Sequence, residues 1–142
     1  KRIVFDEFLM FILGIRKMKE HQEELVSQIP IEENIRSITY AQDKVGIVTD
    51  NVEGGDPYKL RIYDREGSPV FEKTFNYQYT GFDIDGDLVL LYNDSSCKVY
   101  NMTGTEKYNG TFDFTVSKVS AGRFPGTLLV MGPQKMTEIK LQ

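Results

Sequence analysis

The sequence has few of the residues that usually carry catalysis or metal binding. Its 142 residues include one Cys, one His and no Trp. Cys97 alone cannot form an intrachain disulfide, and His21 alone excludes a His-rich metal site. No Asp or Ser motif frames His21 as a catalytic base. We therefore expect no catalytic residues, no cofactor and no metal site, and we expect Cys97 to be a small buried hydrophobe.

Long apolar runs and strong charge are also missing. The longest apolar run, Phe8 to Leu13, is far shorter than the roughly 18 to 20 residues that cross a bilayer. We expect no membrane contact by this segment. The formal net charge is only -4, which argues against nucleic acid or an anionic membrane as partner.

Aromatic and β-branched residues are abundant, and one stretch of them occurs twice. The sequence contains 9 Phe and 8 Tyr, a composition that favours strands. Residues 60–75 read LRIYDREGSPVFEKTF, and residues 97–112 read CKVYNMTGTEKYNGTF. The copies align without a gap, so Asp64 falls on Asn101 and Gly67 on Gly104. Each copy predicts a strand, a turn with Gly at positive φ, and a second strand.

The repeated hairpin belongs to larger units of about 40 residues, which are typical of β-propeller blades. We expect a degenerate blade over residues 1–34, blades over 35–80 and 81–115, and an incomplete blade over 116–142. The sequence thus predicts an all-β fold, a partial β-propeller of about three and a half four-stranded antiparallel blades. Closed propellers have about 4 to 8 blades, so we expect a fragment of a longer protein, with a homodimer closing the blade array as an alternative.

The N-terminal region supports a second interpretation. Pro is absent before position 30, and one helical face is roughly kept by Phe8, Ile12, Ile15, Met18, Leu25 and Ile29. This spacing predicts a helix over about residues 6–29 packed on a smaller β-blade array.

Three consecutive runs carry a resemblance to a known family. They read IRSITYAQDKVGIVTDN, YKLRIYDREGSPVFEKTF and LVLLYNDSSCKVYNMTGTEKYNGTF. Residues 35–142, and residues 1–34 more loosely, resemble the C-terminal blades of an uncharacterised bacterial propeller family, a domain of unknown function. The resemblance implies an upstream membrane-spanning helix in the parent protein and a location on the extracellular side of the bacterial membrane. It supplies no catalytic residues.

Antiparallel strands joined in series alternate ends, so the longer loops and the links between blades share one rim. Loops on a rigid scaffold are common binding sites. This rim mixes aromatic and acidic groups that suit a protein, peptide or glycan partner, although such aromatics also pack between blades. The candidate binding residues are Asp50, Glu53, Asp56, Tyr77, Tyr79, Asp94 and Phe114.

Two further patterns have ordinary explanations in turn chemistry. Asp83, Asp85 and Asp87 alternate like the start of a calcium loop, but Gly86 is fourth rather than sixth, so a tight hairpin turn explains them better. Asn-x-Ser/Thr sequons begin at Asn93, Asn101 and Asn109, where turn or strand positions explain them equally well.

The function predicted from these observations is a non-enzymatic propeller-type interaction module, the soluble part of a longer membrane-anchored bacterial protein. One alternative is an enzyme of the quinone-binding or hydrolase propeller type with its site in blades absent here. The other is a structural or oligomerisation domain.

Overall fold

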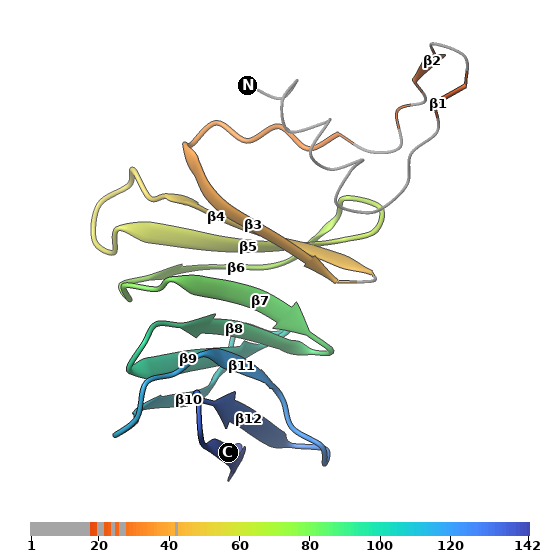
Figure 1. The fold of residues 1–142 in the computed structure, drawn as a ribbon. Coiled ribbons are helices and arrows are strands. Elements are labelled where there is room, and N and C mark those ends of the chain that lie inside the picture. The colour runs from red at the N-terminus through yellow and green to blue at the C-terminus, as the bar shows by residue number, and fades with distance from the viewer. Residues whose placement is uncertain (1–17, 20–21, 24, 26–27, 42) are drawn as a thin grey trace. The chain divides into compact units, whose positions relative to one another are not determined.

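The structure is a computed structural model, and it describes residues 18–19, 22–23, 25, 28–41 and 43–142. Every regular element of this part is a strand (Figure 1). The strands form antiparallel sheets of four, four and three strands and one two-stranded ribbon. The predicted all-β class is therefore confirmed. The chain divides into two compact units, residues 1–76 and 77–142, which are described in turn.

The first unit contains the two-stranded ribbon and one sheet. Its strands are β1 (Met18–Lys19), β2 (Gln22–Glu23), β3 (Ile35–Ala41), β4 (Lys44–Asp50), β5 (Tyr58–Asp64) and β6 (Pro69–Phe75). The second unit contains the other two sheets. Its strands are β7 (Gly81–Asp85), β8 (Leu88–Tyr92), β9 (Ser96–Asn101), β10 (Glu106–Thr111), β11 (Lys118–Ala121), β12 (Thr127–Met131) and β13 (Met136–Lys140).

The sheet of the first unit is buried on both faces of its central strands. Its strand order is β3-β4-β5-β6, so each strand pairs with the next along the chain. On one face, Val45 and Ile47 pack with Ile29, Ile31 and Tyr63. Residues of the opposite face of β4 and β5 are also fully buried, which explains why β4 reads as a nearly continuous apolar run rather than an alternating one.

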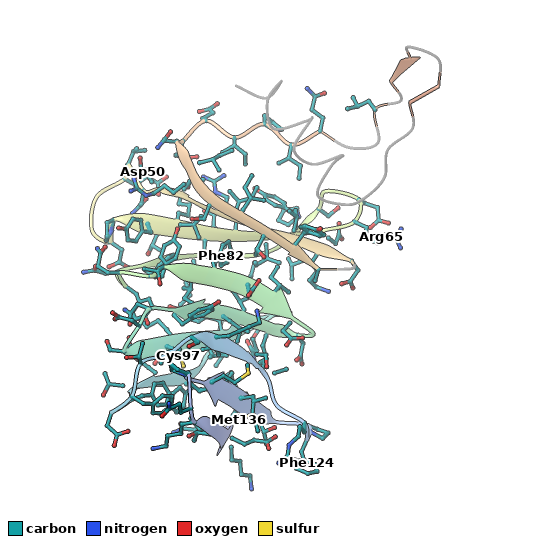
Figure 2. The ribbon with its side chains drawn as sticks, viewed as in Figure 1. Asp50, Arg65, Phe82, Cys97, Phe124 and Met136 are labelled. Atoms are coloured by element: carbon teal, nitrogen blue, oxygen red, sulfur yellow. The ribbon has the colours of Figure 1, made fainter. Side chains whose placement is uncertain are left out.

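The two sheets of the second unit enclose one core. Sheet β10-β9-β8-β7 contributes Leu90, Cys97 and Val99, and sheet β11-β12-β13 contributes Leu128 and Val130. Strand β11 contacts β8 and β7, so the sheets pack face to face. Figure 2 labels Cys97 within this core. Each fully buried side chain of this size contributes about 1.5–3 kcal/mol, so this packing is the main stabilising contact between the two sheets.

The repeated hairpin adopts the same structure in both units. Asp64 Oδ1 accepts hydrogen bonds from the N–H groups of residues 66 and 68, at 3.0 and 2.9 Å. Asn101 Oδ1 accepts the equivalent bonds from residues 103 and 105, at 3.0 and 2.9 Å. Gly67 and Gly104 close the turns at φ 86 and 82, a conformation that only Gly adopts without strain. The strand, turn and strand predicted for each copy are present.

The alternative of a helix over residues 6–29 is wrong where the structure describes it. Met18 pairs with Glu23 and Lys19 with Gln22 as antiparallel strands. Extended strand residues cannot belong to a helix, because the two need different backbone dihedrals. Residues 6–17 and His21 lie outside the described residues, and the degenerate blade over 1–34 stays a prediction. In the part of the chain that the structure describes, no helix is long and apolar enough to span a membrane.

Candidate binding surface

The predicted binding residues fall into two groups, one in each unit. Asp50, Glu53 and Asp56 lie at the end of β4 or in the loop that joins it to β5. Tyr77, Tyr79, Asp94 and Phe114 lie in loops and links of the second unit. Each group therefore consists of residues from a single unit.

The β4–β5 loop of the first unit is held in shape by one side chain. Asn51 Nδ2 donates hydrogen bonds to the carbonyl oxygens of Gly54 and Asp56, at 3.1 and 2.7 Å. Gly54 and Gly55 both have positive φ, at 92 and 83. The loop is thus a fixed turn rather than an open strand connection, and it leaves Val52 72% exposed at its tip.

The acidic residues of this loop bond to groups of the same unit. Asp50 forms a 2.9 Å salt bridge with Arg36, and both side chains stay partly exposed. Asp56 Oδ2 accepts a 3.1 Å hydrogen bond from the Thr74 hydroxyl. These bonds hold the loop on strands β3 and β6, so a ligand would compete with existing partners for both carboxylates.

Beneath the loop, β5 carries two cations that are mostly shielded from solvent. Lys59 is only 5% exposed and lies 3.3 Å from both Glu53 and Glu72. Burial lowers the pKa of Lys59, but the hydrogen bonds that its ammonium donates to Glu72 and Glu53 outweigh this effect and raise that pKa above its usual value. Arg61 pairs with Glu33. Glu53 therefore neutralises a nearly buried cation, which is a structural role.

In the second unit, four segments form a surface that we call the loop rim: residues 77–80, 93–95, 112–117 and 132–135. Backbone and side-chain hydrogen bonds tie the first three of these segments together. Phe112 N–H donates to the Ser95 carbonyl at 2.8 Å, and Val116 N–H donates to the Asp94 carbonyl at 2.9 Å. Asn93 Nδ2 donates to the Gln78 carbonyl at 2.7 Å. These bonds form within the chain itself, so the loop rim is ordered without a bound partner.

Tyr77 and Tyr79 are half-buried in this rim. The Tyr77 hydroxyl and Ser96 Oγ form a 2.7 Å hydrogen bond, and Lys98 Nζ lies 5.9 Å from the centre of the Tyr77 ring. Burial raises the pKa of the Tyr77 phenol. Tyr79 meets Phe82 edge to face at 6.3 Å. Both predicted residues therefore make packing contacts within the unit, with part of each side chain left accessible.

Phe114 ends a row of aromatic rings. Its centroid lies 5.5 Å from that of Phe112, which stacks on Tyr108 at 6.2 Å. Lys135 Nζ lies 5.1 Å from the centre of the Phe114 ring. A Cβ on Gly132 would come within 2.7 Å of the residue 115 carbonyl oxygen, so the 132–135 segment presses directly against the 112–117 link.

Two charged residues flank Phe114 and were missed as candidates from the sequence. The Asp113 side chain is 90% exposed and lies 3.8 Å from Lys135, whose side chain is also largely exposed. Their position beside a candidate aromatic is the signal that could have identified them. With the exposed Asp94, they give the loop rim accessible charges of both signs.

The opposite end of the second unit has a cavity that the sequence did not indicate. It measures about 480 Å³ and lies among the tight turn at Asp87, Lys107 of β10 and the 122–126 loop. The Arg123 guanidinium lies 5.3 Å from the centre of the Phe124 ring, and Phe124 is 60% exposed. Figure 2 labels Phe124. The sequence predicted only tight turns at this end of the unit, and all of the predicted binding residues at the other end.

The alternating carboxylates of β7 join the two sheets of the second unit. Asp85 Oδ2 accepts a 2.8 Å hydrogen bond from the Ala121 N–H, and Asp83 lies 3.5 Å from Lys118. Gly86 has φ 64, and Asp85 pairs with Leu88 across a two-residue turn. The hairpin interpretation of this sequence is therefore confirmed.

The remaining candidate groups also have structural roles. Cys97 is fully buried, and burial raises the pKa of its thiol from 9.0 to about 12. Asn93 Oδ1 accepts a 3.0 Å hydrogen bond from the Ser95 N–H, and Asn101 holds the β9–β10 turn, so both sequon side chains act in turns. Asn109 is exposed on the edge strand β10.

Comparison with solved structures shows the fold. The crystal structure of HIRA(644-1017), a WD40 propeller neighbour, has a TM-score of 0.53 and 12% identity over 78% of this chain and 35% of that one. The chain thus spans about a third of that structure's length. The computationally designed Ika4 protein has a TM-score of 0.37 and 8% identity over 85% of this chain and 100% of that one.

Two further comparisons, with curated proteins and with family models, concern the family to which the chain belongs. No curated protein matches the chain. One family model matches residues 3–141, nearly the whole chain. The chain therefore belongs to the family of unknown function DUF5711.

Proposed function

We propose that this chain is a non-enzymatic propeller-type interaction module that binds a protein or peptide at its loop rim. The observation that carries the proposal is the set of bonds that join the rim segments to one another, including Asn93 to Gln78 and Val116 to Asp94. A surface already ordered in the free protein loses little conformational entropy when a partner binds. Rigid scaffolds that display such loops commonly use them for recognition.

The exposed chemistry of the rim favours a peptide over a glycan. Lys98 and Lys135 lie over the rings of Tyr77 and Phe114, so a cation already occupies one face of each ring on which a sugar could otherwise stack. The accessible groups are instead Asp94, Asp113, Lys135 and backbone carbonyls. These suit charged and hydrogen-bonding groups of an extended polypeptide.

Recognition in this proposal needs no covalent step. The thiol of Cys97 is buried and, with its pKa raised to about 12, protonated at neutral pH, so it supplies no nucleophile. Binding would depend on shape, hydrogen bonds and the mixed charges of the rim.

We place this module on the extracellular side of a bacterial membrane, as part of a longer anchored protein. The support is the resemblance of residues 35–142 to C-terminal propeller blades that follow a membrane-spanning helix. Protease added to intact cells that make the parent protein should digest this domain. Protection until the cells are lysed would contradict the location and leave the binding proposal standing.

Peptide selection tests the binding proposal directly. A random-peptide library is selected on the chain, and enriched peptides are measured by calorimetry against a rim variant that combines Asp94→Lys, Asp113→Lys and Lys135→Glu. These side chains are exposed, so circular dichroism should show an intact fold. We expect affinity to fall by roughly 3- to 150-fold, since each of the three altered charge contacts contributes about 0.2–1 kcal/mol.

A matched control changes charges at the other end of the same unit. The control variant combines Asp87→Lys with Lys107→Glu, near the cavity, and should bind the selected peptides like the unaltered chain. If the control loses affinity and the rim variant keeps it, the binding surface is the cavity end. Equal affinity of all three proteins would also remove the loop rim as the binding surface.

A further inference from the structure

The side chain of Asn93 uses both of its polar atoms within the loop rim. Its Oδ1 accepts hydrogen bonds from the N–H groups of Ser95 and Ser96, at 3.0 and 2.9 Å, and from Ser96 Oγ at 3.0 Å. Its Nδ2 donates to the Gln78 carbonyl at 2.7 Å. The reversed amide would set its NH2 group against these donors and its oxygen against a carbonyl oxygen, so the network fixes the orientation. One residue thus closes the turn after β8 and holds the 77–80 segment at the same time.

The same side chain positions Tyr77, a candidate binding residue. Ser96 Oγ donates its only hydroxyl proton to Asn93 Oδ1, so it accepts the 2.7 Å hydrogen bond from the Tyr77 hydroxyl. Gln78, whose carbonyl Asn93 holds, is the next residue along the chain. Asn93 therefore reaches Tyr77 by two routes, one through the Ser96 hydroxyl and one through the backbone of the 77–80 segment.

The turn that this side chain closes also carries the contacts to the 112–117 segment. The two middle residues of the turn, Asp94 and Ser95, accept the N–H groups of Val116 and Phe112 through their carbonyl oxygens, at 2.9 and 2.8 Å. A change in the shape of the turn would move both acceptors. Three of the four rim segments therefore depend, directly or through this turn, on one amide side chain.

Asn101 offers a comparison at the other end of the same unit. Its Oδ1 accepts the N–H groups of residues 103 and 105, which resembles the turn role of Asn93. Among the described residues, its side chain bonds only through this oxygen. In the first unit, the equivalent residue is Asp64, whose carboxylate makes the same turn bonds. A carboxylate thus serves such a turn, whereas only an amide can also donate as Asn93 does.

We propose that Asn93 is the positioning residue of the loop rim, and that its amide group holds Tyr77 and the 77–80 segment in the shape that binds a peptide. This inference rests on the proposed function of the rim and names the residue that controls it. A segment that is already ordered loses less conformational entropy when a partner binds. Loss of the amide donor should therefore weaken binding without unfolding the chain.

Hydrogen exchange of the free proteins measures the positioning, in Asn93→Asp and in the matched control Asn101→Asp. Both variants keep an acceptor for the turn and add one negative charge, but only Asn93→Asp sets a carboxylate against the residue 78 carbonyl. The Thr80 N–H, which donates to the Tyr92 carbonyl at 2.8 Å, should exchange several-fold faster in Asn93→Asp and at the unaltered rate in the control. Unchanged exchange at residue 80 in Asn93→Asp would overturn the positioning role.

Peptide affinity shows whether the positioning matters for binding. With peptides selected on the unaltered chain, calorimetry should give about 3- to 10-fold weaker binding for Asn93→Asp, since one mobile side chain must be ordered on binding. Binding to Asn101→Asp should be unchanged. Asn93→Ser, which also lacks the amide donor but adds no charge, should weaken binding equally. A loss confined to Asn93→Asp would assign the effect to charge and overturn the role in binding.

The rim variant of Asp94, Asp113 and Lys135 separates this inference from the proposed function. If that variant loses affinity while both Asn93 variants bind normally, the proposed function stands and the inference is wrong. If that variant binds like the unaltered chain, the loop rim is not the binding surface, and the binding role of Asn93 is wrong with it. Exchange at residue 80 still decides the positioning role in that case.

Discussion

The buried thiol of Cys97 should make the protein unusually sensitive to alkaline pH. Cys97 is fully buried in the core of the second unit, and its thiol pKa is raised from 9.0 to about 12. Because the native pKa lies above the unfolded one, the native state keeps the proton over this range while the unfolded chain loses it. The stabilising contribution is fully present below pH 9 and is lost as the pH rises towards 12.

The size of the effect follows from the pKa difference. Each pH unit between the two pKa values removes about 1.4 kcal/mol from the free energy of unfolding. Raising the pH from about 8 to about 10.5 crosses roughly 1.5 units of this window, so the thiol alone should cost about 2 kcal/mol. That is a large fraction of the stability of a typical domain.

Urea unfolding followed by circular dichroism at both pH values measures this loss, with Cys97→Ala as the control. Removing the sulfur should cost about 1 kcal/mol at either pH through lost packing, but it removes the titrating group. Lys59, Tyr77 and Tyr108, whose pKa values are also raised, add an alkaline loss of the same direction to both proteins. The unaltered chain should therefore lose about 2 kcal/mol more than the variant. Equal losses would refute the reasoning.

Three further substitutions test the loops. Asn101→Ala removes the acceptor of two turn N–H groups and should lower the free energy of unfolding by about 1–2 kcal/mol in urea titrations, whereas an unchanged midpoint would show that water replaces the side chain. Tyr77→Phe should cost about 0.5–1.5 kcal/mol by the same assay, since it removes the bond to Ser96, and the cost should vanish in a Ser96→Ala background. Gly132→Ala should lower the melting temperature by several degrees, because its Cβ meets a backbone carbonyl, and an unchanged value would contradict the close approach.

For the candidate binding residues, the sequence pattern predicted the positions in loops but not the contacts that the side chains and backbone make. Antiparallel order was enough to predict that Asp94 and Phe114 lie in loops of one unit. It did not show that the Asp94 carbonyl accepts the Val116 N–H, nor that Glu53 reaches the nearly buried Lys59. Such contacts join residues of different segments, and their geometry depends on the packing of whole sheets. The cavity beside Phe124 was missed for the same reason, because several separate segments line it.

The sequence by itself determined the strands, the repeated hairpin and the all-β class. Alternation of apolar residues, the Asp64 and Asn101 turns and the glycines at 67 and 104 are local signals that act within a few residues. Only the tertiary structure decided which polar groups are already paired and which remain accessible. Burial and the raised pKa of the Cys97 thiol arise from neighbours that are distant in sequence and that only packing brings together.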